Sequence, residues 1–385
     1  MEHVVARPFE KRFFLALVLV AIIALQFWTS SRYPALNEKA MMSGAIQLED
    51  PLSFEAYFEI RPEYPAWRKI SLTTLNWVKT NQQGMIFGVL FGSAFLTLLG
   101  YMKRRSFKGR FSNSLAGMGL GAPLGVCVNC AAPIAKALYS GGARVESVLS
   151  AMIASPTLNI VVLTMLFSIM PAYMAVTKIA LSVFVILVAV PVICWYLPER
   201  QLQLTKGDRQ ASSIPVPTLP YSEIETIRHA TEYFVRDFLR NLWYVASRTV
   251  PLMFAAGFLG AVIATLLPPS LLSETPFGII ALVFVSVIGT FLPVPIGFDV
   301  VVSGALLGSG LDKGFVMALL FTLGIFSIYS YFIVAGAISA RAATLIGSVV
   351  IAIGILGGAG VHYYHAYKTR QALEILTGFE LSLIG

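Results

Sequence analysis

The sequence has little charge for its length. Of its 385 residues only 12% are Asp, Glu, Lys or Arg, whereas 57% are hydrophobic. Soluble domains usually carry about a quarter charged residues and just under half apolar ones. A soluble chain of this composition could not cover its surface with polar groups. The sequence therefore predicts a multi-spanning membrane protein.

Cysteine is also scarce, and three residues are too few for a disulfide framework. The sequence shows no glycine-rich phosphate loop, no zinc-ligand set and no catalytic triad pattern. We therefore expect neither an enzyme nor a bound cofactor or metal. The formal net charge is +8, but the basic residues lie in short connectors between apolar runs. Such a distribution suits membrane topology and anionic lipid heads, so no nucleic-acid partner is expected.

Apolar runs long enough to cross a bilayer recur along the chain, since a spanning helix needs about 20 apolar residues. Seven full spans are expected, at residues 13–28, 84–102, 147–170, 172–197, 242–267, 314–335 and 342–363. The first run lacks a small-residue cleavage pattern after it and is predicted to be an uncleaved helix. Trp67 and Trp77 are expected at the membrane interface.

These runs divide the chain into five parts. They are an N-terminal span with an extracytoplasmic segment (1–83), a first repeat (84–197), a cytoplasmic linker with an amphipathic helix (198–241), a second repeat (242–363) and a tail (364–385). The stretch 103–110 carries only basic charges, which places it in the cytoplasm. From Ser222 apolar residues recur at helical spacing, which predicts the amphipathic helix on the inner membrane surface.

Topology constrains two further apolar segments, 113–143 and 278–308. Residues 103–110 and the linker 198–241 are both expected in the cytoplasm, and two full spans lie between them. Because these two spans already bring the chain back to the cytoplasmic side, segment 113–143 cannot cross the membrane. This segment must therefore enter and return on one side, and Pro123 and Pro133 allow a turn at depth. The same reasoning makes 278–308 a hairpin entered from the outer face. The predicted fold class is an all-α polytopic membrane protein with two re-entrant broken-helix hairpins.

The two halves of the chain are related in layout. An ungapped self-alignment at an offset of 168 residues matches positions between Gly121 and Val148 to positions between Gly289 and Val316. Both halves also share the order span, hairpin, span, span. Because the halves would start on opposite sides of the membrane, the repeat is predicted to be inverted, a common plan in transporters.

The stretch GVCVNCAAPIAKALYSGG, residues 125–142, is the main candidate for a solute site. Irregular backbone is tolerated in a membrane only where protein or a water-filled cavity satisfies it. Two broken helices that meet at the midplane therefore predict such a site. Its candidate residues are Cys127, Asn129, Cys130, Pro133, Lys136, Ser155, Asn159 and Asp299.

The candidate residues also have ordinary explanations. Buried free cysteines often only fill apolar space. Lys136 can attract an anion or lie at the mouth of the hairpin. Ser155 and Asn159 can line a cavity or satisfy backbone that a nearby proline frees. Asp299 can carry a coupling proton or cap the following helix. Lys178 is close enough to a span end that we expect it to reach the interface.

Residues 121–159, GAPLGVCVNCAAPIAKALYSGGARVESVLSAMIASPTLN, resemble the signature of a bacterial family of predicted permeases. That family includes the ArsP-type exporters of trivalent organoarsenicals. Its usual form is a Cys-rich turn followed by Pro, a Gly-containing turn and an Ala-Ser-Pro-x-x-Asn segment. Those places are filled here by Cys127, Pro133, Gly141, Ser155, Pro156 and Asn159. The family more often shows Cys-x-Cys, whereas here Asn129 holds the second place and the second thiol is Cys130.

The resemblance implies a multi-pass permease of the bacterial inner membrane that exports a small solute by alternating access. A thiophilic solute such as a trivalent organoarsenical is expected, because soft sulfur ligands select soft partners. The expected partners are this solute, the lipid bilayer and a coupling proton. Two alternatives stay open, namely transport of a small inorganic or sulfur-containing anion, and a membrane thiol-redox or assembly protein.

Overall fold

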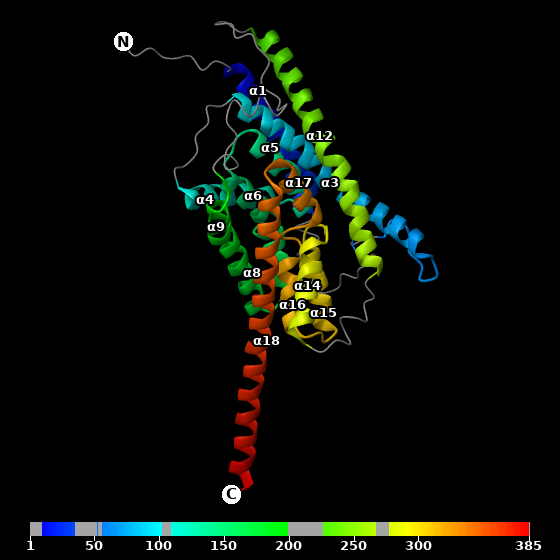
Figure 1. Ribbon diagram of the computed structural model, residues 1–385, viewed down its shortest axis with the longest axis vertical. Helices are drawn as coiled ribbons and strands as arrows, with labels where there is room; N and C mark the ends of the chain where they lie inside the picture. Colours follow the sequence, from blue (N-terminus) through cyan, green and yellow to red (C-terminus); the bar gives the residue numbers. More distant parts are fainter. Residues whose placement is uncertain are drawn as a thin grey trace.

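The computed structural model is helical throughout, and every secondary-structure element that it describes is a helix (Figure 1). The described residues are 10–34, 52, 56–101, 109–198, 226–266 and 277–384. The expected all-α class is therefore confirmed. Most of the expected cytoplasmic loop at 103–110 and of the linker before residue 226 lies outside the described residues.

The helices of the first half and the N-terminal region are α1 (Glu10–Phe27), η1 (Trp28–Arg32), α3 (Ala66–Tyr101), α4 (Arg110–Gly121), η2 (Ala122–Leu124), α5 (Val128–Ser140), α6 (Val145–Thr157), α7 (Ile160–Ile169), α8 (Ala172–Phe184), η3 (Val185–Ala189) and α9 (Val190–Trp195). Those of the second half are α12 (Ile227–Leu266), α14 (Ile279–Phe291), α15 (Phe298–Gly308), α16 (Lys313–Thr322), α17 (Ile328–Ala337) and α18 (Ala340–Ile384). Here η1 and η3 are π-helical turns and η2 is a 3₁₀ turn.

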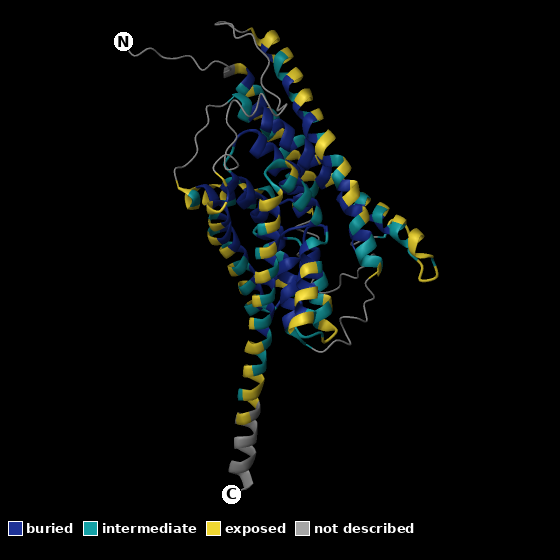
Figure 2. Cartoon of the chain, in the orientation of Figure 1, coloured by how far each residue is buried: buried dark blue, intermediate teal, exposed yellow. Residues whose placement is uncertain are grey.

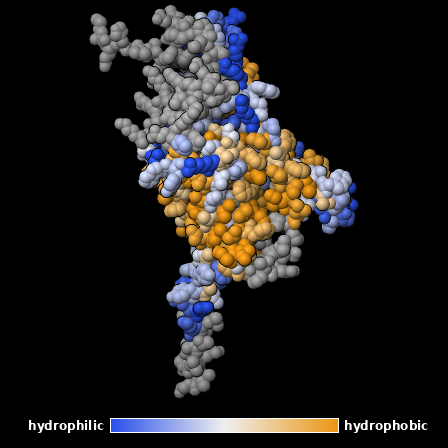
Figure 3. Space-filling view, viewed as in Figure 1, coloured by the Kyte–Doolittle hydropathy of each residue, from blue (hydrophilic) through white to orange (hydrophobic). Residues whose placement is uncertain are grey.

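Five of the described helical segments are long and apolar enough to cross a membrane. They are Lys11–Arg32, Ala66–Tyr101, Ala172–Trp195, Ile227–Leu266 and Ala340–Ala372. A sixth span results if α6 and α7, which are bent by 42° at a short break, count as one. Apolar side chains form a broad band around the middle of the molecule, and hydrophilic ones gather at its two ends (Figure 3). The chain is therefore a multi-pass membrane protein.

The expected span at 314–335 is not one helix. It consists of α16 and α17, each of 10 residues, with a break between them. Gly324 lies in this break with φ +80°, a left-handed conformation that glycine adopts without strain. The run is predominantly apolar and contains no proline, so its composition alone did not predict the interruption. The expectation of seven continuous spans is wrong at this point.

Three of the expected boundaries between parts of the chain fall inside helices. α3 runs through residues 83 and 84, α12 through 241 and 242, and α18 through 363 and 364. The amphipathic segment and the span that follows it are therefore one helix, α12, of 40 residues. Trp77, expected at the interface, is fully buried within α3, so this expectation is wrong.

The order of helices repeats between the halves. α6, α7 and α8 begin at residues 145, 160 and 172, and α16, α17 and α18 begin at 313, 328 and 340, the same shift of 168 residues each time. In each half two short helices precede this set: α4 and α5 both pack on α6, and α14 and α15 both pack on α16. The inversion of one half relative to the other, and the re-entrant path of the short helices, stay predictions.

The buried core lies where the short helices meet. Its main cluster joins α5, α6 and α7 to α16, α18 and the α8–α9 region. Exposed residues instead dominate the first turns of α12 and the far part of α18, which extends beyond the packed body (Figure 2). The interior of the molecule is thus built around interrupted helices, whose ends carry the polar groups considered next.

Candidate functional site at the broken helices

The first break separates α4 from α5. Gly125 turns the chain with φ +59°, and α5 begins at Val128. Two side chains satisfy the backbone that this turn exposes. Trp28 Nε1 donates to the carbonyl of Pro123 at 3.2 Å, and the Val126 N–H donates to Ser155 Oγ at 3.2 Å. Buried backbone groups need such partners where no water is present.

The second break, residues 292–297, separates α14 from α15 in the other half. Gly297 has φ +76° and directly precedes α15. The indole Nε1 of the buried Trp77 donates to the carbonyl of Pro293. Each break therefore has a tryptophan indole bound to a proline carbonyl, an arrangement that the sequence did not reveal.

Asn129 joins the two breaks. Its Nδ2 donates to the carbonyl of Val294 at 3.2 Å, and its Oδ1 accepts from Ser327 Oγ at 3.1 Å. Ser327 also caps α17 by accepting the N–H of Ser330, whose hydroxyl donates to the carbonyl of Val128 at 3.4 Å. The N-terminal ends of α5 and α17 therefore converge at Asn129. Helix N-termini carry partial positive charge, so this point favours an electron-rich ligand.

Cys127 and Cys130 form a disulfide at the start of α5. Cys127 is the N-cap residue, and its Sγ accepts the N–H of Cys130 at 3.2 Å. Both residues are buried, and Asn81 Oδ1 lies 3.9 Å from Cys127 Sγ. The pair is thus oxidised in this structure, whereas the sequence left thiol, disulfide and plain packing open.

A buried arginine that the sequence analysis missed lies beside this pair. Arg32 is only 7% exposed, and among the described residues its Nε has no hydrogen-bond partner. Its guanidinium lies 4.5 Å above the ring of Phe27. A Cβ built on Gly84 would be 2.5 Å from Cys130 Sγ and 3.9 Å from Arg32 Nη2. The cation and the disulfide therefore face the same small space.

Lys136 is also buried, two turns further along α5. Its ammonium lies 5.9 Å from the ring centre of Tyr244 on α12, and Tyr244 bonds to Ser140 through its hydroxyl at 3.1 Å. Pro133, between Lys136 and the disulfide, is buried where α5 passes α3. The contribution of both residues to a solute path stays a prediction.

Ser155 and Asn159 serve the backbone in this structure. Asn159 caps α7 by accepting the N–H of Val162 at 3.0 Å, and its Nδ2 donates to the carbonyl of Ser155 at 2.7 Å. Ser155 in turn contacts the backbone of Val126 at the first break. Their contact with a solute stays a prediction. The repeat offset also aligns Asn159 with Ser327. This alignment could have identified Ser327 as the N-cap residue of the corresponding helix in the second half.

Asp299 is the second residue of α15, and its carboxylate forms an ion pair with the ammonium of Lys178 on α8. The Lys178 side chain is 1% exposed. The expectation that Lys178 reaches the interface is therefore wrong. It faces the core instead, where Asp299 supplies the opposite charge. A single lysine inside an otherwise apolar span was the signal that could have identified it.

An apolar groove lies elsewhere. It has a volume of about 320 Å³ between α3 and α12 and is lined by Val78, Gln82, Met85, Ile86, Val89, Leu90, Val250, Met253 and Phe254. Because Gln82 is its only polar side chain, this groove offers little for the recognition of a polar solute. The convergence of helix N-termini at Asn129 is the better candidate site.

Helices that span a membrane, together with polar residues gathered at interrupted helices, define the class of permeases. The chain belongs to a family described as predicted permeases, whose model matches residues 83–360. This match confirms the resemblance drawn from residues 121–159. The chain is also 25% identical over 276 residues to the UPF0718 protein YraQ of Escherichia coli (strain K12), covering 71% of this chain and 75% of that protein. No solved structure matches significantly.

Proposed function

We propose that this permease lies in the bacterial inner membrane and exports a small thiophilic solute, such as a trivalent organoarsenical, by alternating access. One observation carries the proposal: the Cys127–Cys130 pair lies at the start of α5, next to the point where Asn129 joins the two halves. A soft electrophile bound by these sulfurs would sit at the junction that must open and close during transport. No enzymatic step is required.

The chemistry assigns a role to each redox state of the pair. A trivalent arsenical that carries two hydroxyls reacts with two thiols, forming two As–S bonds and releasing two waters. The disulfide form has no thiol to offer. Binding therefore requires prior reduction of Cys127–Cys130, with two electrons and two protons supplied by a dithiol reductant.

A second candidate is transport of a small inorganic or sulfur-containing anion. The buried guanidinium of Arg32, whose Nε has no partner among the described residues, favours it. So do the converging N-termini of α5 and α17, which attract negative charge. In this case the solute would not need the sulfurs, and transport would survive their replacement.

The third candidate, a membrane thiol-redox or assembly protein, is favoured by the disulfide itself. A Cys-x-x-Cys pair at a helix N-terminus is a common arrangement in disulfide exchange. The pair is buried, however, and exchange needs access for an attacking thiolate. This candidate predicts a changed disulfide state in cells that lack the protein, without any solute flux.

Purified protein in liposomes separates these candidates. We expect protein that was reduced beforehand to take up phenylarsine oxide. In Cys127→Ser this uptake should fall by about tenfold or more, because one As–S bond is lost. Cys194→Ser is the matched control, since Cys194 is a buried free cysteine away from the breaks. Thiosulfate uptake that survives Cys127→Ser would support the anion candidate. Wild-type protein that moves neither solute would contradict both transport candidates.

A further inference from the structure

The Lys178–Asp299 ion pair is a charge connection between the two halves of the molecule. Lys178 lies on α8 of the first half and Asp299 on α15 of the second, and both side chains are buried. Burying an ion pair costs desolvation that the mutual attraction often only just offsets. A pair kept inside an apolar membrane protein is therefore a functional candidate.

A neutral bridge at another place shows that charge is not needed to join the halves. Asn129 and Asp299 are each the second residue of the helix that follows a break. Asn129 bridges to the opposite half with an amide and the hydroxyl of Ser327. The two halves are thus joined by neutral groups at one place and by charges at another. The packing of the two halves therefore does not by itself explain why the Lys178–Asp299 pair is charged.

No other ionisable group competes for this role in the described surroundings. α7 and α16 pack on α15. α7 contains no ionisable side chain, and the single one in α16, Lys313, begins that helix and contacts His365. From α8 only Lys178 forms an ion pair with Asp299. The charge on this carboxylate therefore decides whether Lys178 has a counter-ion.

The pair is also connected to the candidate solute site. Residues 292–297 run directly from the Asn129 contact at Val294 to the start of α15. On its other side, a Cβ built on Gly324 would lie 3.6 Å from Asp299 Cγ, so the break before α17 touches this carboxylate. Ser327, the second partner of Asn129, closes that break. A movement of Asp299 would therefore shift both partners of Asn129.

We propose that the Lys178–Asp299 pair is a proton-binding lock, which holds the halves together when ionised and releases them when Asp299 takes up a proton. The inference rests on the proposed transport function. Protonation changes the pair from net neutral to a single positive charge on Lys178. An ammonium without a counter-ion is unfavourable in an apolar interior, so α8 and α15 separate. Loss of the proton on the other side restores the pair.

The test compares two charge-neutral double variants of the full chain. Lys178→Met/Asp299→Asn removes the lock without leaving one buried charge alone. Arg144→Met/Glu146→Gln is the matched control: Glu146 is fully buried and pairs with Arg144 at 3.1 Å, but both belong to one half. Thermal unfolding first confirms that both variants fold.

The first readout needs no solute. Deuterium uptake of residues 292–308 is measured at about pH 5.5 and about pH 7.5, and each protection factor is calculated against the intrinsic exchange rate of the amides at the same pH. We expect acidification to reduce protection about tenfold in the wild type and the control, because opening exposes these amides. The lock variant should show no pH response. A wild type without a pH response, or a lock variant that keeps one, would overturn the proposal.

The second readout uses phenylarsine oxide in liposomes. We expect the lock variant still to exchange phenylarsine oxide across the membrane when the pH is equal on both sides. Its accumulation of the arsenical under an imposed pH gradient should fall by about tenfold or more, because coupling requires the proton site. Gradient-driven accumulation that persists in this variant, or that falls equally in the control, would overturn the lock. A wild type that moves no arsenical would refute the proposed solute only, since deuterium uptake still decides on the lock.

Discussion

Asn129 is the residue with the most connections across the molecule. Its amide uses one hydrogen-bond donor and one acceptor to hold Val294 and Ser327, which belong to the other half. A carboxylate at this position could accept from Ser327 but could not donate to the Val294 carbonyl. An amide satisfies both partners at once.

Replacement of Asn129 by Leu should therefore impair both folding and transport. Leaving the carbonyl of Val294 and the hydroxyl of Ser327 without partners should cost about 1–3 kcal/mol of unfolding free energy. Solute uptake in liposomes should fall by about tenfold or more, since the junction between the halves loses its bridge.

Asn76→Leu is the matched control for Asn129→Leu. Asn76 makes two comparable bonds, to the N–H and the carbonyl of Phe58 at 2.9 and 3.0 Å, and neither bond joins the two halves. It should lose similar stability, measured by thermal unfolding, while transport per folded molecule is kept. Equal loss of transport in both variants would show that Asn129 has only a structural role.

At the residue scale the sequence predicted some roles and missed others for a physical reason. Asn129 and Asp299 stood out because polar groups in apolar runs are costly. Arg32 and Lys178 were hidden because a long cationic side chain near a span end ordinarily reaches the interface. Whether such a side chain turns outward or inward depends on its partner, which for Lys178 is a carboxylate from another helix, Asp299 on α15.

Close packing of α3 on α5 determines where the disulfide lies. A Cβ at Gly84 would come within 2.5 Å of Cys130 Sγ, and one at Gly88 within 2.6 Å of the Cys130 carbonyl oxygen. Both glycines lie one turn apart on the same face of α3. Their lack of a side chain lets the start of α5 approach the backbone of its neighbour.

Alanine at Gly84 or Gly88 should therefore separate the two helices. We expect a loss of about 1–3 kcal/mol in unfolding free energy for each, as is typical for overpacking. Gly360→Ala in α18 is the control, because a Cβ there meets nothing within 4 Å. It should be neutral or slightly stabilising. Thermal unfolding in detergent checks all three, and an unchanged melting temperature in Gly88→Ala would contradict the packing.

At the element scale the sequence predicted the order of helices better than their continuity. The offset of 168 residues found in the sequence also relates the first residues of three successive helices. The breaks were predictable only where Pro and Gly gather, as around Gly125. The break at Gly324 lies in an apolar run and depends on a left-handed backbone angle that composition does not show.

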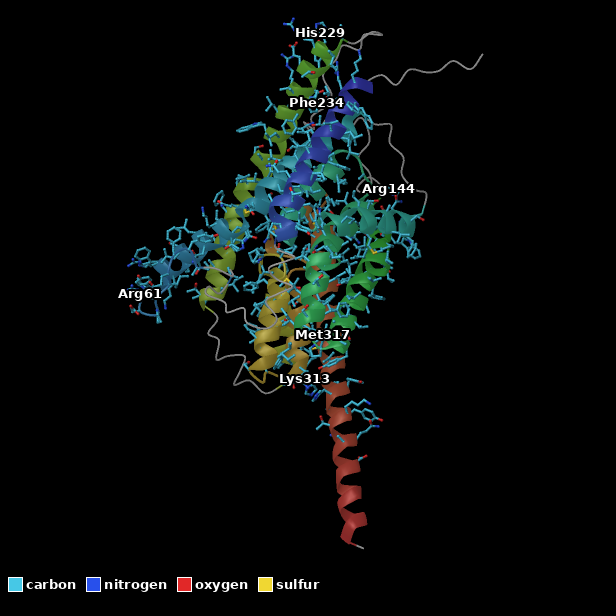
Figure 4. All side chains as sticks on the ribbon, turned by 180° about the vertical axis from the view of Figure 1, so that it is seen from behind. Arg61, Arg144, His229, Phe234, Lys313 and Met317 are labelled. Atoms are coloured by element: carbon cyan, nitrogen blue, oxygen red, sulfur yellow. A yellow bond between two sulfur atoms is a disulfide. The ribbon has the colours of Figure 1, made fainter. Side chains whose placement is uncertain are left out.

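The whole molecule presents an apolar band with hydrophilic ends (Figure 3). Seen from behind, Arg61 and His229 lie at well-separated points of the periphery, on the turn before α3 and on the first turns of α12 (Figure 4). The basic stretch at 103–110 follows the end of α3, so the start of α3 should be on the outer side. The start of α12 should then be cytoplasmic.

Labelling of single cysteines tests this orientation. In intact spheroplasts, a membrane-impermeant maleimide should modify Glu63→Cys but not His229→Cys, which should react only after lysis. Both positions are exposed. The native cysteines can remain, because two form a disulfide and Cys194 is buried. Labelling of His229→Cys before lysis would reverse the predicted topology.

For the whole molecule, composition alone was sufficient to predict a membrane protein, because a chain so poor in charge has to be surrounded by lipid. It was not sufficient for the shape. The 45-residue α18 and the 40-residue α12 each join an apolar and a polar stretch of sequence without a break. Because polar residues support a helix as well as apolar ones, a change in hydropathy does not mark the end of a helix.

The two indole contacts give the protein a built-in optical reporter at each break. Trp28 binds the carbonyl of Pro123 and Trp77 that of Pro293, whereas Trp67, Trp195 and Trp243 are exposed. Replacing these three with phenylalanine would leave one native fluorophore per break. Replacing one of the two remaining indoles as well would give an emission spectrum that follows a single break through a transport cycle, without any attached dye.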